Sequence, residues 1–236
     1  ATLPLVYLLY LCFIQISSKM EVIDFAQRPS IIGQYMTELR DVNKQTDMLR
    51  FRANLERIGE IMAYEISKTM SYRMEEIETP LAPCMSPVLY EEVVLATIFR
   101  AGVPFHKGFL NIFDHSQNAF VSAYRKYKEK ENFDVFIEYL ASPKLDGKTL
   151  IIADPMLATG ASMELSYRAL LTKGTPAKVH VASVIASRQA IEYVKNTFPD
   201  DRTTVWAAAI DDEINSHSYI VPGLGDAGDL AYGIKE

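Results

Sequence analysis

Short apolar runs separated by helical segments dominate the region from residue 93 to residue 210. The runs that we expect to be strands cover residues 93–99, 119–124, 149–153, 178–185 and 203–210. Segments with helical features lie between them, at residues 104–113, 163–173 and 189–198. Strands that alternate with helices need crossover connections, so this order predicts an α/β fold with a Rossmann-like, mainly parallel sheet covered by helices on both faces. Ligands of such sheets bind beyond the carboxyl ends of the strands, which makes the loops there the first candidates for a site.

Further segments surround this predicted sheet. Residues 47–70 carry apolar side chains at helical spacing, which predicts a long amphipathic helix and an N-terminal helical arm. Pro80, Pro83 and Pro87 make the following segment unfavourable for regular structure. Residues 133–140, rich in aromatic and branched side chains, predict an extra strand outside the main sheet.

Length and composition limit the number of domains and the kinds of partner. The 236 residues, 49% of them hydrophobic, favour one globular domain, which we assign to residues 20–236. The formal net charge of −6 argues against a large nucleic-acid surface, which would need a basic face. Cys12 and Cys84 match no metal-ligand or redox spacing, so we expect small buried side chains in a reducing cytoplasm. The histidines show no metal spacing either, and His106 fits a pyrophosphate contact or a solvent-facing loop residue.

The N-terminus carries an almost uninterrupted apolar run, residues 3–16. The run is shorter than the roughly 20 residues needed to span a bilayer. It also lacks the basic start and the small-residue cleavage site of a secretory signal. The first methionine is Met20, so we interpret residues 1–19 as a non-native extension or as sequence upstream of the true start, with no membrane role. A genuine hydrophobic tail, packed on the protein or on a neighbouring subunit, is the alternative.

The strand at residues 149–153 leads into a loop of mostly small residues that opens a helix. The loop consists of Asp154, Pro155, Met156, Leu157, Ala158, Thr159, Gly160, Ala161 and Ser162. Backbone N–H groups at a helix start bind anions, and the hydroxyls of Thr159 and Ser162 can donate to phosphate oxygens. Asp154 can accept hydrogen bonds from sugar hydroxyls. The loop is neither a Walker A motif nor a dinucleotide-binding glycine turn, and taken alone it fits an ordinary helix N-cap equally well.

As a whole, this loop resembles the phosphoribosyl pyrophosphate (PRPP) loop of uracil phosphoribosyltransferases, which also have a proline at the position of Pro155. A second segment, residues 219–229, resembles the uracil-recognition segment of the same family. The resemblance implies a uracil site made of Ile220, Gly225, Asp226 and Ala227. Asp226 would also contact PRPP. Backbone groups of such a loop can pair with the edge of uracil and would be left unpaired by cytosine; the alternative is a glycine-rich turn without a ligand.

Two arginines follow predicted strands. Arg100 begins an Arg-Ala-Gly turn after residues 93–99, and Arg125 follows the strand at residues 119–124. Guanidinium groups bind phosphate oxygens in a bidentate way and remain charged. Isolated arginines would be interpreted as surface ion pairs, but both match family positions that bind PRPP. The resemblance thus implies a catalytic set of Arg100, Arg125, Asp154 and Asp226.

The resemblance is strong from residue 100 to residue 233 and loose before that. Residues 103–107 and 126–131 depart from the family pattern, and the second of these segments would belong to a small hood or flap. The family has the type I phosphoribosyltransferase fold. The chain would therefore combine a mainly parallel sheet, flanking helices, a small hood and the N-terminal helical arm.

The activity that the resemblance implies is pyrimidine salvage, in which uracil and PRPP give UMP and pyrophosphate. It also implies Mg²⁺ bound with PRPP, with no metal site assigned to the chain itself, and a cytoplasmic homo-oligomer, a dimer or larger. GTP activates some family members, and the acidic balance argues against a nucleic-acid partner. A phosphoribosyltransferase for another base, a pyrimidine-responsive regulator that binds RNA and a non-catalytic relative are the alternatives. No residue stands out as a general base.

Overall fold

The computed structural model describes residues 19–127 and 133–235, which are built around one mainly parallel sheet. Its strands are β1 (Glu21–Asp24), β4 (Val93–Phe99), β5 (Gln117–Tyr127), β6 (Phe133–Ala141), β7 (Thr149–Ala153), β8 (Met156–Leu157), β9 (Lys178–Ser187) and β10 (Thr203–Asp211). The order across the sheet is β1-β10-β9-β7-β4-β5-β6, and β8 pairs with β9. Among the described strand pairs of this sheet, only β5–β6 is antiparallel. The predicted α/β fold is confirmed.

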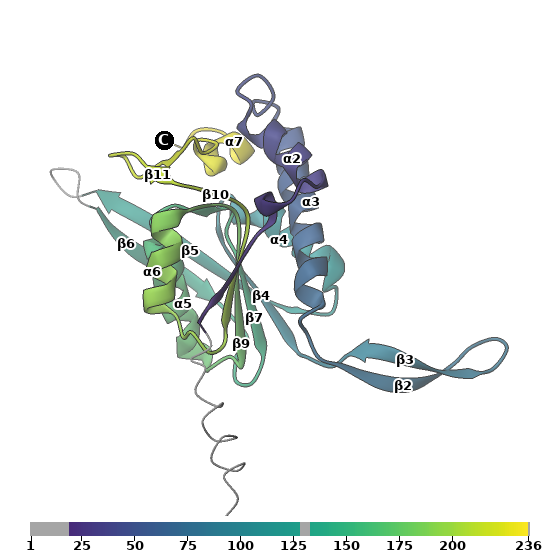
Figure 1. Ribbon diagram of the computed structural model, residues 1–236. Helices are drawn as coiled ribbons and strands as arrows, with labels where there is room; N and C mark the ends of the chain where they lie inside the picture. The colour runs from purple at the N-terminus through teal and green to yellow at the C-terminus, as the bar shows by residue number, and fades with distance from the viewer. Residues whose placement is uncertain (1–18, 128–132, 236) are drawn as a thin grey trace, which may run out of the picture.

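Helices cover both faces of the sheet (Figure 1). One face carries α2 (Ile31–Arg40), α3 (Met48–Ser67) and α4 (Gly102–Ile112), and the other carries α5 (Ala161–Leu170) and α6 (Arg188–Thr197). Short 3-10 turns, η1 (Phe25–Gln27) and η2 (Leu171–Lys173), complete these layers. Side chains alternate along a strand, so Ile151 of β7 is buried with the α3 side chains, whereas Leu150 and Ile152 are buried with those of α5. Burial on both faces explains why the strands are continuous apolar runs.

The N-terminal region is part of this architecture. The predicted amphipathic helix is confirmed as α3, where the Asp47 side chain accepts a hydrogen bond from the N–H of Arg50 at 3.0 Å and Leu55 and Ile58 are fully buried. The sequence pattern did not predict β1 or α2. Strand β1 nevertheless pairs with β10 at one edge of the sheet, and α2 packs in the same core as α3.

The proline-rich segment is regular, which contradicts the sequence-based expectation. Strands β2 (Tyr72–Glu78) and β3 (Pro83–Leu89) form an antiparallel hairpin that extends away from the sheet (Figure 1). Both edges of a two-stranded ribbon are free of further strands, so a proline is tolerated wherever its nitrogen faces an outer edge. Pro83 and Pro87 are four residues apart and therefore have their nitrogens on the same edge.

The segment at residues 133–140 also differs from its prediction. It forms β6, which belongs to the main sheet as its edge strand and pairs with β5 from Phe120↔Ala141 to Tyr127↔Phe133. The side-chain pattern of residues 133–140 indicated a strand but not the strand with which it pairs. Backbone hydrogen bonds, which do not depend on that pattern, join it to β5.

Cys84 is exposed, so the prediction of a buried side chain was wrong. It lies on β3, and a hairpin that leaves the sheet has no second layer to bury it. Cys12 and residues 1–18 lie outside the described residues, as do residues 128–132 of the expected hood. Among the helices of residues 19–127 and 133–235, none is long and apolar enough to cross a membrane.

Candidate active site

The loop after β7 is fixed by its backbone to the neighbouring strand β9. The carbonyl of Pro155 accepts a hydrogen bond from the N–H of Ile185 at 2.9 Å. The carbonyl of Ala158 accepts one from Oγ of Ser187. Because the carbonyls are held in this way and β8 pairs with β9, the loop has a defined position at the carboxyl end of the sheet.

Helix α5 begins directly after Gly160. This glycine has a φ of +85°, and a Cβ placed on it would lie 2.7 Å from Cδ1 of Tyr193, so both its backbone conformation and its surroundings require glycine. Glycine brings no capping side chain, and the N–H of Ala161 makes only a long hydrogen bond of 3.4 Å to Oγ1 of Thr159. The start of α5 therefore retains the anion-binding character that helix N-termini have.

The predicted loop residues follow the end of β7, include the short strand β8 and reach the first two residues of α5. Oδ1 of Asp154 accepts a hydrogen bond from the N–H of Met156 at 3.3 Å. The half-buried members are Asp154, Met156, Thr159, Ala161 and Ser162, and the buried ones are Pro155, Leu157, Ala158 and Gly160. The loop thus exposes parts of its carboxylate and hydroxyl side chains while its apolar side chains enter the core.

Arg100 follows β4, the strand next to β7. Oγ1 of Thr97 donates to the carbonyl of Ala153 at 3.2 Å, which links the ends of the two strands just before Asp154. The side chain of Arg100 is 38% exposed, and its guanidinium donates from Nη2 to Oδ1 of Asp229 at 2.7 Å and from Nη1 to the carbonyl of Gly233 at 3.2 Å. Arg100 therefore connects the strand ends to the C-terminal segment.

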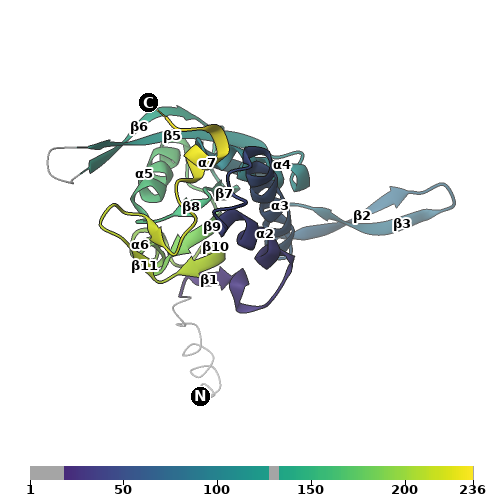
Figure 2. The ribbon, with the colours of Figure 1, turned by 90° about the horizontal axis from the view of Figure 1, so that it is seen from above.

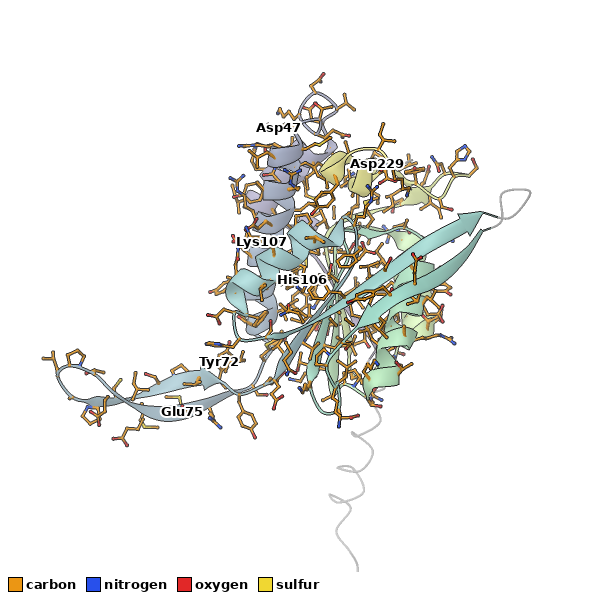
Figure 3. The ribbon with its side chains drawn as sticks, turned by 180° about the vertical axis from the view of Figure 1, so that it is seen from behind. Asp47, Tyr72, Glu75, His106, Lys107 and Asp229 are labelled. Atoms are coloured by element: carbon orange, nitrogen blue, oxygen red, sulfur yellow. The ribbon has the colours of Figure 1, made fainter. Side chains whose placement is uncertain are left out.

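That segment lies over the carboxyl ends of the central strands. It contains β11 (Glu213–Ile214), β12 (Ile220–Val221) and α7 (Ala227–Tyr232). Seen from above, α7 lies between α5 on one side and α2 and α3 on the other (Figure 2). Figure 3 shows Asp229 above the sheet, beside these N-terminal helices. The uracil-recognition segment and the PRPP loop proposed from the sequence therefore occupy the same end of the molecule.

The predicted uracil residues differ in their surroundings. Ile220 is 4% exposed and its side chain belongs to the apolar core, and Ala227 is buried too. Gly225 is exposed. Asp226 is half-buried, and its Oδ1 accepts hydrogen bonds from the N–H groups of Gly228 and Asp229, at 2.9 and 3.0 Å. Its carboxylate is thus the N-cap of α7 in addition to the role that the sequence suggested.

Two further sequence-predicted positions are placed differently. The backbone of Arg125 lies in β5, opposite Val135 of β6, and its side chain lies outside what the structure describes. His106 is 5% exposed on α4, with its ring 5.6 Å from that of Phe120, so the interpretation as a solvent-facing loop residue was wrong. Burial lowers the pKa of His106, although Asn118 opposes this effect. His106 and Lys107 are neighbours on α4 (Figure 3), but His106 packs toward Phe120 of β5, whereas Lys107 pairs with Glu56 of α3.

Sequence reasoning missed an ion pair beneath the C-terminal segment. Arg40 of α2 binds both carboxylate oxygens of Asp211, the last residue of β10, at 2.7 and 2.8 Å. Burial disfavours the charged form of Asp211, but the hydrogen bonds from Arg40 and from the N–H of Gly223 outweigh it and lower the pKa. The position of Asp211 at a strand end was the available signal, because strand ends of a parallel sheet converge on its ligand site.

The arrangement suits an anionic ligand that also carries hydroxyl groups. The start of α5 and the guanidinium of Arg100 supply positive charge, and Asp154 supplies acceptors for hydroxyl groups. Within the described residues, no three His, Cys, Asp or Glu side chains gather to hold a metal ion.

Comparisons with known proteins give consistent matches. The family model described as uracil phosphoribosyltransferase matches residues 26–234. A protein of that name from Porphyromonas gingivalis is 60% identical over 216 residues, which are 92% of this chain and 100% of the relative. Another of the same name, from Pyrococcus furiosus, is 38% identical over 215 residues and covers 90% of each chain.

A solved structure also resembles the whole described architecture. The AQ2163 protein from Aquifex aeolicus matches with a TM-score of 0.80 and 27% sequence identity, covering 90% of this chain and 98% of its own. At this coverage the similarity is not confined to the loops that carry the motifs.

Proposed function

Because this chain belongs to the uracil phosphoribosyltransferase family, we propose that it transfers the phosphoribosyl group of PRPP to uracil, giving UMP and pyrophosphate. The observation that carries this proposal is the meeting of two segments at one end of the sheet. The start of α5, which we propose binds phosphate, and the C-terminal segment both lie at this end (Figure 2). Arg100, which follows β4 beside β7, contacts the C-terminal segment. The reaction needs both, since PRPP and the base must bind side by side.

The proposed roles follow from the chemistry of each group. The N–H groups at the start of α5, with Thr159 and Ser162, bind the 5-phosphate, and Asp154 accepts hydrogen bonds from the ribose hydroxyls. Arg100 and Arg125 bind the pyrophosphate oxygens. Arg100 can do so while bound to Asp229, because a guanidinium has five N–H donors.

The base is read by the C-terminal segment. Backbone groups from Gly225 to Ala227, and of Ile220, pair with the N–H and carbonyl groups of uracil. Asp226 faces both substrates, and its fixed position as the N-cap of α7 supports this role because a capping carboxylate has a defined orientation. Cytosine presents a different pattern of donors and acceptors and would leave buried groups of this segment unpaired.

The chemical step is a displacement at the anomeric carbon of the ribose. A bond forms between N1 of uracil and this carbon, the bond from the carbon to the pyrophosphate oxygen breaks, and the N1 proton passes to water or to Asp226. The transition state has oxocarbenium character, so positioning and charge stabilisation by the arginines supply the catalysis. Mg²⁺ bound with PRPP offsets part of the charge of the leaving group.

Several properties of the enzyme are proposals of the same kind. They are a cytoplasmic location, assembly as a homo-oligomer, and activation by GTP, for which the described residues suggest no effector site. Exposed apolar side chains on the β2–β3 hairpin, including Leu81, Met74 and Met85, support assembly, because apolar surface of this kind is more stable when covered.

The direct test is UMP formation by the purified chain with uracil, PRPP and Mg²⁺, followed by chromatography. The proposal predicts UMP in proportion to enzyme. PRPP binding by calorimetry without any UMP would instead identify a regulator or a non-catalytic relative. A gel shift with RNA at two salt concentrations would detect an RNA-binding regulator, since phosphate contacts weaken with salt.

A further inference from the structure

The ion pair between Arg40 and Asp211 joins the N-terminal helices to the C-terminal segment. Arg40 is the last residue of α2 and Asp211 the last residue of β10. The pair is bidentate, at 2.7 and 2.8 Å, and the Asp211 side chain is only 8% exposed. The side chain of Gln45 donates to the carbonyls of Leu39 and Arg40 at 3.2 and 3.1 Å, which fixes the end of α2. Gln45 therefore fixes the backbone that carries Arg40.

The same two side chains bind both backbone polar groups of Gly223. The N–H of Gly223 donates to Oδ2 of Asp211 at 2.8 Å, and its carbonyl accepts from Nη1 of Arg40 at 3.0 Å. Gly223 has a φ of +60°, and a Cβ placed on it would lie 2.0 Å from the carbonyl oxygen of Ile220. The turn is thus held by an ion pair on one side and packed against Ile220 on the other.

Gly223 lies between Ile220 and the residues from Gly225 to Ala227, the two parts of the proposed base-reading segment. The PRPP loop has a separate support, because its carbonyls at Pro155 and Ala158 are held by β9. A change in the ion pair should therefore displace the base-reading segment and leave the PRPP loop in place. Removing one partner would also leave the other charge partly buried and uncompensated, so the turn cannot simply keep its position.

We propose that Arg40 and Asp211 are positioning residues that set the affinity and selectivity for uracil through Gly223. Neither residue needs to touch a substrate for this role. The inference rests on the proposed function. It adds two residues that lie outside the segments resembling the family motifs and that would act on the uracil site through Gly223.

Steady-state kinetics of Asp211→Asn and Arg40→Lys test the inference. Asp211→Asn removes the negative charge of the pair. Arg40→Lys keeps the positive charge but loses the bidentate hydrogen bonds to Asp211 and the hydrogen bond to Gly223. We expect the KM for uracil to rise by about tenfold in both variants, the effect of roughly one lost charged hydrogen bond. The KM for PRPP should rise less than the KM for uracil, because the loop after β7 keeps its own contacts with β9 and only Asp226 of the proposed PRPP residues lies in the displaced segment.

Asp212→Asn is the matched control. Asp212 is the next residue in the chain and also pairs with an arginine, Arg188, but its side chain is 75% exposed. We expect wild-type constants for both substrates in this variant. A midpoint of thermal unfolding for each protein identifies a loss of folding, and Arg40→Lys keeps the test valid if Asp211→Asn does not fold.

The outcomes separate this inference from the proposed function. UMP formation by wild type with an unchanged KM for uracil in both variants would overturn the inference alone. Equal increases in both KM values, in step with a lower unfolding midpoint, would also overturn it, because the pair would then be only structural. If wild type forms no UMP, the proposed function falls, and the inference falls with it.

Discussion

Arg100 donates a 2.7 Å hydrogen bond to Asp229, and so the turn after β4 is bound to the first turn of α7. These two residues come from the segments proposed to hold the pyrophosphate and the base. Their contact makes Arg100 the structural link between the two segments. We therefore expect that pyrophosphate binding at Arg100 affects the position of the segment that binds the base.

Replacing Arg100 by lysine keeps the charge and removes the planar fork. We expect kcat/KM for PRPP to fall by roughly 30-fold, as for the loss of a charged hydrogen bond worth about 2 kcal/mol. The measurement is initial rate against PRPP concentration at saturating uracil. Arg73→Lys is the control, since Arg73 lies on the distant β2–β3 hairpin, where it pairs with Glu75.

Asp229→Asn separates the two roles of Arg100. If Arg100 only holds α7, this variant should reproduce the loss seen in Arg100→Lys. Our account expects a smaller loss, because the arginine keeps its contact with the pyrophosphate. Wild-type kcat/KM in Arg100→Lys would contradict the account.

Replacing Gly160 by alanine should weaken both the fold and the PRPP site. The left-handed backbone costs about 1–2 kcal/mol for alanine, and the new Cβ would press on Tyr193. We expect a lower free energy of unfolding in urea and a higher KM for PRPP. Gly147→Ala is a close control, because Gly147 has a φ of +73° with no atom within 4 Å of the added Cβ. Equal KM values for PRPP in the two variants would show that the start of α5 does not bind this substrate.

Asp226 can be tested for its two roles by comparing alanine with asparagine. Alanine removes the cap of α7, at a cost of about 1 kcal/mol, whereas asparagine caps a helix as well as aspartate does. We expect turnover to fall about 100-fold or more in both variants if the charge acts on substrate, with stability lost only in Asp226→Ala. Asp47→Ala, which removes the cap of α3 (Figure 3), should lose similar stability and keep full turnover. Wild-type turnover in Asp226→Asn would mean that the carboxylate is only a cap.

His180 should make stability depend on pH in a narrow range. Burial lowers its pKa from 6.5 to about 4, with nearby Lys178 adding to the effect and Glu91 opposing it. Its Nδ1 accepts a hydrogen bond from Nε1 of Trp206 at 3.1 Å, which favours the neutral ring. Between pH 6.5 and 4 the unfolded chain binds the proton and the folded chain does not, so stability is highest above pH 6.5 and falls as the pH drops.

The size of this fall can be measured by urea unfolding at pH 7 and pH 4.5. The shift of His180 corresponds to at most about 3 kcal/mol, and buried His106 acts in the same direction. His180→Asn should lose a large part of the difference, whereas the same change at exposed His217 should not. An identical fall in His180→Asn and wild type would contradict the assignment.

The parts of the fold that depend on local sequence could be predicted from it. The strand β7, the loop from Asp154 to Ser162 and the start of α5 follow one another within a short stretch, so apolar periodicity and small residues suffice to identify them. The apolar stripe of α3 could be predicted for the same reason, because it depends only on residue spacing within one segment. The hairpin at β2 and β3 was missed because prolines usually interrupt strands, and only the free edges of a two-stranded ribbon make them acceptable.

Contacts between distant segments could not be predicted in this way. Arg40 and Asp211 are 171 positions apart, and neither side chain has a local feature that marks it as a partner of the other. The pairing of β1 with β10 and the contact of Arg100 with Asp229 likewise depend on how distant parts of the chain come together. The residues proposed to bind substrate were visible as motifs, whereas those proposed to hold them in position required the fold.

The central claim is that the C-terminal segment selects uracil, and pyrophosphate release with a panel of bases tests it most directly. Uracil, cytosine, hypoxanthine and orotate would each be offered with PRPP and Mg²⁺ at equal concentrations. The account predicts release with uracil and a kcat/KM for cytosine lower by roughly 10⁴-fold, since a site built to pair with one base leaves its polar groups unpaired by another. Release with another base and none with uracil would contradict it.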